Sequence, residues 1–295
     1  MAKLRNYLSL VKFSHTIFAM PFAMVGFTLG WRQQTTHSNA YTKYPLLFSL
    51  FLVILCMVFA RNAAMSFNRY LDRSFDALNP RTAIREIPAG ILSGQQVLLF
   101  TVINSILFML TTWWINPLCL ALSPIALAVI LFYSYTKRFT ALCHLVLGLG
   151  LSLAPVGSYL AITGTFALLP ILFSLLVLFW VAGFDIIYAL QDEEFDKHHQ
   201  LHSIPAALGK KNALHVASFL HVLAALLVCL IGINDIFGWF FAIGSGAFIG
   251  LLIYQHSLVK PDDLSKVNIA FMTSNGIASI IFSASVIADL LIKQY

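Results

Sequence analysis

Charged residues are scarce in this sequence. Of its 295 residues, 10% are Asp, Glu, Lys or Arg and 59% are hydrophobic, whereas about a quarter of the residues of a typical soluble domain are charged. So few charges cannot cover a water-facing surface, and the composition predicts an integral membrane protein. The formal net charge of +6 is compatible with nucleic-acid binding. However, the basic residues lie between hydrophobic runs, and we expect no nucleic acid as a partner.

Cysteines and cleavage signals are also few. The chain has four cysteines, all in hydrophobic stretches and none in a C-x-x-C pair, and we interpret them as small buried hydrophobic residues. Lys3, Arg5 and Lys12 precede the first hydrophobic run. No small-residue cleavage site follows that run, so the sequence predicts an uncleaved first helix.

Long hydrophobic runs make up most of the chain. Each has the roughly 17–25 residues that a helix needs to cross a bilayer. The nine predicted spans are 14–31, 45–67, 96–115, 118–135, 141–163, 166–190, 213–233, 236–256 and 267–291. No stretch between them is long enough for a soluble module. The sequence therefore predicts an all-α polytopic protein with one domain, residues 1–295, and nine transmembrane helices.

The basic residues are unequally divided between the two sides of these spans. Fourteen lysines and arginines lie on the side of the N-terminus and three on the other side, which predicts a cytoplasmic N-terminus. The cytoplasmic connections around 68–95 and 191–212 are long, while the opposite-side links near Asn116–Pro117, Gly164–Thr165 and Asn234–Asp235 are tight turns. Long connections in a compact protein are usually functional, so we expect these two segments to have a functional role.

Acidic residues gather in two short stretches, 72–86 and 185–196, that overlap these two segments. Eight of the twelve lie there: Asp72, Asp76, Glu86, Asp185, Asp192, Glu193, Glu194 and Asp196. In a helix, residues four apart share a face, so each segment is predicted to present a stripe of side-chain oxygens at the cytoplasmic end of a span. Stacked like charges repel unless they are neutralised. Because Mg²⁺ combines carboxylates with water and substrate phosphates, we infer a Mg²⁺ site that joins the stripes to a diphosphate.

Two other interpretations of the acidic residues remain open. In the first, the acids are ordinary helix ends that pair with Arg69, Arg73 and Arg85. In the second, the protein is a divalent-cation transporter, for which acids near the bilayer midplane in broken helices are expected. The neighbouring arginines would repel a permeating cation, which disfavours transport.

The two acidic segments resemble each other. Ile87-Pro88-Ala89 follows the first and Ile204-Pro205-Ala206 follows the second. This similarity suggests an internal four-plus-four helix repeat with a ninth helix appended.

At these residues the sequence resembles the UbiA superfamily of intramembrane aromatic prenyltransferases. The family's NxxxDxxxD motif matches Asn68, Asp72 and Asp76, and its second DxxxD motif matches Asp192 and Asp196. The runs NRYLDRSFDALNPRTAIREIP, YSYTKRFT and YALQDEEFDKHHQLHSIP resemble the 4-hydroxybenzoate polyprenyltransferase branch. The resemblance covers essentially the whole chain.

The resemblance implies nine transmembrane helices around a central cavity, which the two long cytoplasmic connections cap. It also implies Mg²⁺ held by both motifs, a polyprenyl diphosphate and an aromatic acid as substrates, and C-prenylation with loss of diphosphate. We expect ubiquinone or menaquinone biosynthesis in the bacterial inner membrane, with the active site facing the cytoplasm and membrane lipid as a partner. Prenylation of another quinone precursor, of haem or of a chlorophyll-type acceptor remains an alternative. The metal-binding set is Asn68, Asp72, Asp76, Asp192 and Asp196.

The basic residues near the motifs are expected to bind the anionic groups, because guanidinium fits phosphate and carboxylate in a bidentate manner. Arg69, Arg73, Arg81 and Arg85 form one group, from which Arg69, Arg73 and Arg85 are selected as substrate contacts. Lys137 is assigned to the diphosphate and Arg138 to the aromatic carboxylate.

Two residues of the sixth span are expected to act in catalysis. Asp185 is either a third metal ligand or the carboxylate that orients the aromatic hydroxyl and accepts the proton. Tyr188 either supports the carbocation with its ring face or only packs. His198, His199 and His202 form a cluster that could indicate a transition metal. Hydrated loop histidines are the favoured interpretation, since the nearby ligands are hard oxygens.

Overall fold

The computed structural model describes residues 2–11, 18–36 and 43–292, and in them helices account for nearly all regular structure. They are α1 (Ala2–Leu10), α2 (Met20–Thr36), α3 (Leu46–Leu71), α4 (Arg73–Leu78), α5 (Gly94–Ile115), α6 (Pro117–Thr136), α7 (Cys143–Thr163), α8 (Leu168–Ala189), α9 (Glu193–His198), α10 (Ile204–Gly232), α11 (Trp239–Leu258) and α12 (Asn275–Ile292), with a 3-10 turn η2 (Leu190–Asp192) and a π-helical turn η3 (Ile269–Ser274). The predicted all-α fold is confirmed.

Eight helices of the described chain are long and apolar enough to cross a membrane. The first predicted span, 14–31, corresponds to α2, which has 17 residues, and residues 14–17 lie outside the described part. The span predicted at 213–233 belongs to α10, which already begins at Ile204. Gly209, with φ of 77°, interrupts this helix before the membrane-spanning part, because a left-handed conformation suits glycine.

Local sequence signals fix several helix ends. Ser93 and Gln96 form a reciprocal capping box at the start of α5. Asn116 accepts a hydrogen bond from the Cys119 backbone N–H (2.8 Å) and Pro117 opens α6, as expected for a polar cap followed by proline. Gly164 ends α7 in the left-handed conformation. The Asn116–Pro117 and Gly164 signals lie at the tight turns predicted on the side away from the acidic motifs, whereas Ser93 ends the long connection on the motif side.

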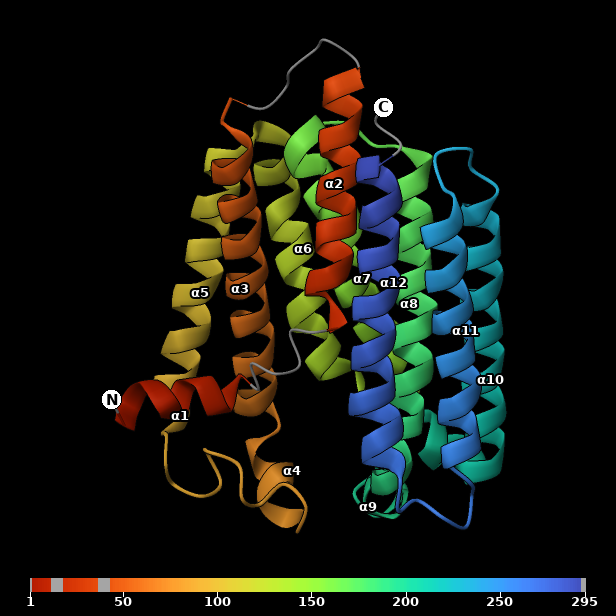
Figure 1. Ribbon diagram of the computed structural model, residues 1–295. Coiled ribbons are helices and arrows are strands. Elements are labelled where there is room, and N and C mark those ends of the chain that lie inside the picture. The colour runs from red at the N-terminus through yellow and green to blue at the C-terminus, as the bar shows by residue number, and fades with distance from the viewer. Residues whose placement is uncertain (1, 12–17, 37–42, 293–295) are drawn as a thin grey trace.

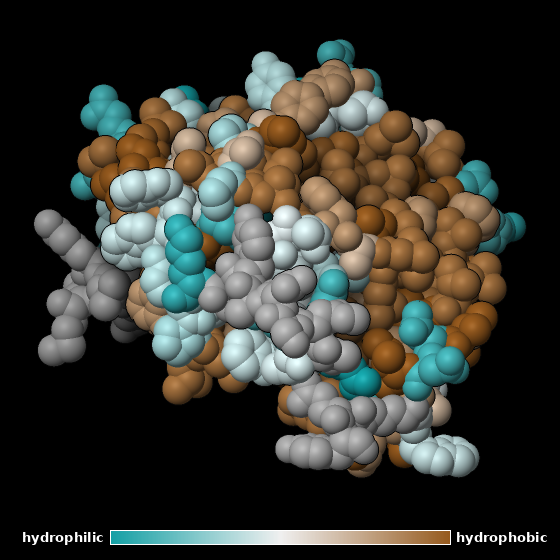
Figure 2. Space-filling model, turned by 90° about the horizontal axis from the view of Figure 1, so that it is seen from above, coloured by the Kyte–Doolittle hydropathy of each residue, from teal (hydrophilic) through white to brown (hydrophobic). Residues whose placement is uncertain are grey.

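The two acidic segments lie at one end of the bundle. In Figure 1 the long helices stand side by side, and α4 and α9 both lie at the lower end, where α1 crosses the foot of α3 and α5. Ser9 of α1 donates a hydrogen bond to Glu86 (2.5 Å). The prediction of sidedness depends in part on Lys12, which lies outside the described residues. Figure 2, which looks onto the opposite end, shows broad hydrophobic areas with hydrophilic residues standing singly.

An aromatic cluster surrounds the buried Trp180 of α8. Its ring lies 5.4 Å from that of Phe22 in α2, 5.7 Å from Phe248 in α11 and 5.1 Å from Phe184. Aromatic rings at these separations and tilts gain attraction beyond area burial. This cluster joins α2 and α11 to α8, the helix that leads into the second acidic motif.

Candidate active site

A cavity of about 670 Å³ lies among the helices and connections at the α4 and α9 end. Eleven of the twelve site residues predicted from the sequence line it: Asn68, Arg69, Asp72, Asp76, Arg85, Lys137, Arg138, Asp185, Tyr188, Asp192 and Asp196. Residues from α3, α4, α6, α8 and α9 therefore meet in one space, although the two motifs are more than a hundred positions apart in the chain.

Arg73 is the exception. Its guanidinium lies 4.4 Å from the centroid of the Tyr70 ring and donates a hydrogen bond to the Tyr70 carbonyl (2.6 Å). It is exposed and does not line the cavity. Arg73 therefore lies outside the cavity that the other predicted substrate contacts line, and it is not among the proposed substrate contacts.

Each acidic motif contains a helix break, which the sequence analysis did not anticipate. The helix α3 ends at Leu71, and Asp72 (φ −88°, ψ 4°) separates it from α4. Asp192 (φ −104°, ψ 4°) likewise separates the end of η2 from α9. The prediction of one continuous stripe for each motif is therefore wrong, since the last aspartate of each motif lies on a short separate helix. The two breaks have nearly the same geometry, which agrees with the suggested repeat.

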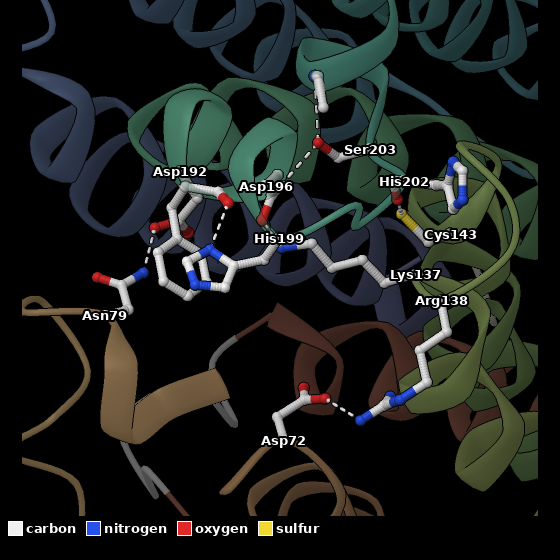
Figure 3. A network of polar contacts seen from close by, with 12 residues as sticks. Asp72, Asn79, Lys137, Arg138, Cys143, Asp192, Asp196, His199, His202 and Ser203 are labelled. Carbon is white, nitrogen blue, oxygen red and sulfur yellow. Dashed lines mark hydrogen bonds and ion pairs between the residues drawn. The ribbon is translucent and has the colours of Figure 1, made fainter. Parts of the chain in front are cut away.

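Two adjacent residues at the end of α6 reach both motifs. Lys137 Nζ lies 2.7 Å from Asp196 Oδ1, and Arg138 donates to Asp72 Oδ1 at 3.0 Å. In Figure 3 these two side chains extend from neighbouring backbone positions toward different aspartates. The first and second motifs therefore face each other across a gap that neighbouring side chains span.

The connection after the first motif also reaches the second. Arg81 donates to both oxygens of Asp192, at 3.0 and 2.5 Å, and to the Tyr188 hydroxyl at 3.0 Å. Asn79 donates to the same carboxylate at 3.1 Å. Arg81 is one of the four arginines near the first motif, but it is not among the substrate contacts predicted from the sequence. No role is predicted for Asn79. A spacing argument has no signal for either, because the contact depends on how the loop folds back.

The proposed metal ligands differ in their hydrogen-bond partners. Asp76 Oδ1 accepts from Arg85 at 2.6 Å, while its buried Oδ2 has no hydrogen-bond partner among the described residues. Asp196 is completely buried and accepts from the Ser203 hydroxyl at 2.8 Å. Asn68 donates its amide N–H to Asp72 Oδ2 at 3.0 Å, which leaves its amide oxygen to act as an acceptor.

The electrostatic environment of the cavity favours strong pairing of charges. Burial raises the pKa of the Asp72 carboxyl, and Arg138 counteracts only part of this shift. For Lys137, burial opposes the charged form, but the ion pair with Asp196 outweighs it and the pKa of Lys137 is raised. The pKa of Arg81 is raised in the same way, with Asp192 outweighing burial. The cations therefore remain charged beside the acids.

The aspartate deeper in α8 has a histidine partner. Asp185 Oδ2 lies 2.7 Å from His144 Nδ1 of α7, and both residues line the cavity. His144 is not among the site residues predicted from the sequence, although a histidine inside a hydrophobic span is a recognisable signal. Tyr188 packs its ring against Phe271 of η3, with centroids 4.2 Å apart.

The donor chemistry of the cavity suits a hard cation that also binds substrate oxygens. Within the described ranges, no three His, Cys, Asp or Glu side chains converge into a metal cage, and His198, His199 and His202 form no such cluster. The structural alternative of acids paired with nearby arginines holds for Asp76 and Arg85. It does not account for Asp72 and Asp192, whose partners come from α6 and from the loop after α4.

Comparison with known proteins assigns the chain to a family. Residues 18–277 match the UbiA prenyltransferase family. A 4-hydroxybenzoate octaprenyltransferase from Tolumonas auensis is 30% identical over 82% of this chain and 84% of its own length. The apo structure of a UbiA homologue from Aeropyrum pernix K1 superposes with a TM-score of 0.78, at 28% identity over 95% of this chain and 98% of that one.

A second solved structure shares the fold at lower identity. It is a UbiA homologue from Archaeoglobus fulgidus bound to DMAPP and Mg²⁺, with a TM-score of 0.74 and 22% identity over 97% of this chain and 99% of that chain. The family match covers most of the sequence and includes both acidic motifs. The chain therefore belongs to the UbiA prenyltransferase family and is a polyprenyltransferase.

Proposed function

We propose that this protein transfers a polyprenyl group from polyprenyl diphosphate to a ring carbon of 4-hydroxybenzoate or a related aromatic acid, with Mg²⁺, in ubiquinone or menaquinone biosynthesis. The observation that carries the proposal is the meeting of both aspartate motifs and their cations in one cavity. The name of the Tolumonas relative supports the aromatic acceptor. The Archaeoglobus complex supports an allylic diphosphate and Mg²⁺ as ligands of this fold.

The residues present fit Mg²⁺. The proposed ligands are Asn68, Asp72, Asp76, Asp192 and Asp196, all of them oxygen donors of the kind that hard divalent cations prefer. Asp76 supports the assignment most directly, because a buried carboxylate oxygen without a hydrogen-bond partner is costly unless a ligand satisfies it. When bound, Mg²⁺ supplies positive charge to the diphosphate oxygens as the allylic C–O bond breaks.

The chain's own cations act on the same leaving group. Arg81, Arg85, Lys137 and Arg138 each pair with an aspartate of the motifs. If the aspartates bind metal, these cations become available to anions in the same cavity. We assign Arg81, Arg85 and Lys137, with the buried Arg69, to the diphosphate, where fixed positive charge stabilises the departing group. Arg138 is assigned to the carboxylate of the aromatic acid.

Bond making and proton transfer take place in the deeper part of the cavity. The ring carbon bonds to the allylic carbon, the C–O bond to the diphosphate breaks with both electrons leaving on oxygen, and Asp185 accepts the ring proton. Tyr188 and Phe271 form an aromatic wall beside Asp185 that can face the allylic cation. The surrounding apolar helices exclude water, which would otherwise capture the cation.

The whole chain, residues 1–295, is proposed to act as a single transmembrane domain, and the two helix breaks support a four-plus-four repeat. The α4 and α9 end is proposed to face the cytoplasm of a bacterial inner membrane. Cysteine labelling in intact cells tests the orientation. A cysteine at the exposed Ile84 should react only after permeabilisation, and one at the exposed Trp239 of the other end should react in intact cells.

A product assay tests the proposed function. Purified protein in lipid vesicles is incubated with Mg²⁺, geranyl diphosphate and, separately, 4-hydroxybenzoate and a hydroxynaphthoic acid. We expect an acid that has gained a geranyl group and lost one hydrogen, with the new bond on a ring carbon by fragmentation in the mass spectrometer. Asp72→Asn should abolish the product, and Asp263→Asn, in an exposed loop, should not. Folded protein that yields no prenylated arene would refute the proposal.

A further inference from the structure

The second residue of α7, His144, is buried and bridges two parts of the site. It is 3% exposed. Its Nδ1 lies 2.7 Å from Asp185 Oδ2, and its Nε2 lies 3.3 Å from the backbone nitrogen of Ile204, where it accepts the N–H. Ile204 is the first residue of α10 and follows the turn after the second acidic motif. One imidazole ring therefore contacts the deep carboxylate and the connection that follows the second motif.

These two contacts determine which ring nitrogen carries the hydrogen. A backbone N–H can only donate, so the hydrogen bond from Ile204 requires a lone pair on Nε2 of His144. The hydrogen then resides on Nδ1, which donates to Asp185. His144 therefore presents an N–H donor to Asp185, and this hydrogen bond fixes the orientation of the carboxylate.

We propose that His144 is a positioning residue for prenyl transfer, and that it holds the Asp185 carboxylate in the orientation in which it accepts the ring proton. This inference rests on the proposed function, because it assigns a role only if an aromatic ring loses a proton at this site. The Asp185 side chain is 23% exposed. His144 occupies Oδ2, and Oδ1 remains to accept the proton released when the ring carbon has bonded to the prenyl group.

The same ring connects Asp185 to the second acidic motif. Ser203, which precedes Ile204, donates its hydroxyl to Asp196 and accepts the Ala206 N–H as the cap of α10. A series of contacts thus runs from Asp196 through Ser203 and Ile204 to His144 and Asp185. The placement of the proton acceptor and that of a proposed metal ligand therefore depend on one turn of the chain.

Two amide substitutions separate the two contacts of His144. The amide N–H of asparagine lies near the position of Nδ1, so His144→Asn retains a donor to Asp185 and loses the acceptor for Ile204. The longer side chain in His144→Gln places its amide near Nε2, so it retains a partner for Ile204 and loses the donor to Asp185. A role confined to anchoring the loop would make the asparagine variant the worse enzyme.

We expect the opposite order. In His144→Gln, kcat should fall by roughly 10- to 100-fold, the loss that displacement of a catalytic group typically causes, with KM for geranyl diphosphate unchanged. His144→Asn should retain most of the kcat, and Asp185→Asn should lose more than either. An acid deuterated at the accepting ring carbon should show a primary isotope effect on kcat that is larger in His144→Gln than in the wild type, because proton removal has become slower.

Equal kcat values in the two amide variants, or an isotope effect unchanged in His144→Gln, would overturn the inference while leaving the proposed function intact. Failure of the wild type to prenylate any aromatic acid would instead refute the proposed function. Thermal melting checks that each variant folds. If His144→Gln does not fold, His144→Ala with added imidazole replaces it: restoration of kcat by imidazole is expected, and no restoration contradicts the proposal.

Discussion

Replacement of Arg81 by alanine tests how the loop after the first motif takes part in catalysis. Arg81 donates two hydrogen bonds to Asp192 and one to Tyr188. In the proposed reaction, the positive charge of Arg81 stabilises the departing diphosphate. We therefore expect Arg81→Ala to lower kcat/KM for polyprenyl diphosphate.

The contacts set the size of the effect. A hydrogen bond to a charged group contributes about 1.5–3 kcal/mol. The Arg81 side chain is 32% exposed, so solvent screens part of this contribution. Arg81 also neutralises Asp192 before substrate binds, and the loss of that pair offsets some of the loss in the transition state. A net loss of about 1.4–2.7 kcal/mol corresponds to a roughly 10- to 100-fold fall in kcat/KM.

Arg73→Ala is the matched control, since Arg73 follows the same motif but stacks on Tyr70 outside the cavity. Initial rates of transfer are measured in vesicles at saturating aromatic acid and varied geranyl diphosphate. We expect kcat/KM of Arg73→Ala to remain within about twofold of the wild type, a difference of less than roughly 0.5 kcal/mol. An equal loss in both variants, or no loss in Arg81→Ala, would refute the assignment of Arg81.

Three further predictions concern packing, a buried polar network and the metal. A Cβ on Gly183 would lie 2.4 Å from Nε2 of the buried His221. Gly183→Ala should therefore lower Tm by about 2–12 °C, for an overpacking cost of roughly 1–3 kcal/mol. A Cβ on Gly157 would have no atom within 4 Å, so Gly157→Ala should not lower Tm. Asn275 donates to Gln255 and accepts from Trp180, so Asn275→Leu should cost about 1–3 kcal/mol in thermal melting, whereas Asn212→Ala on the exposed surface should leave Tm nearly unchanged. Chelation of divalent metal should abolish transfer and added Mg²⁺ should restore it; transfer that persists in the chelator would contradict the metal assignment.

The helices and the meeting of the two motifs were predictable from the sequence for simple reasons. Spans follow from long apolar runs, and the division of lysines and arginines places both long connections at one end. Carboxylates that lie at the same end of one helix bundle are expected to be close to each other. The structure accordingly brings Asp72 and Asp192 into one cavity.

The remaining features depend on tertiary contacts that leave no pattern in the chain. Neither Asp72 nor Asp192 is glycine or proline, so no local signal marks the helix breaks. The choice of Arg81 over Arg73 depends on a turn in which Thr82 donates its hydroxyl to the Asp76 carbonyl (3.1 Å). His144 is recognisable in the sequence as a histidine inside a hydrophobic span, but its partner Asp185 follows only from the packing of α7 against α8.

The most direct test of the central claim is a double-mutant cycle on binding of an unreactive thio-analogue of geranyl diphosphate with Mg²⁺. Kd is measured by calorimetry for the wild type, Asp72→Asn, Asp192→Asn and the double variant, with Asp263→Asn as control. If both motifs hold one metal-bound diphosphate, each single substitution should weaken binding and the double variant should lose much less than the sum, because the sites are coupled. Strictly additive losses, or tight binding by either single variant, would contradict the account.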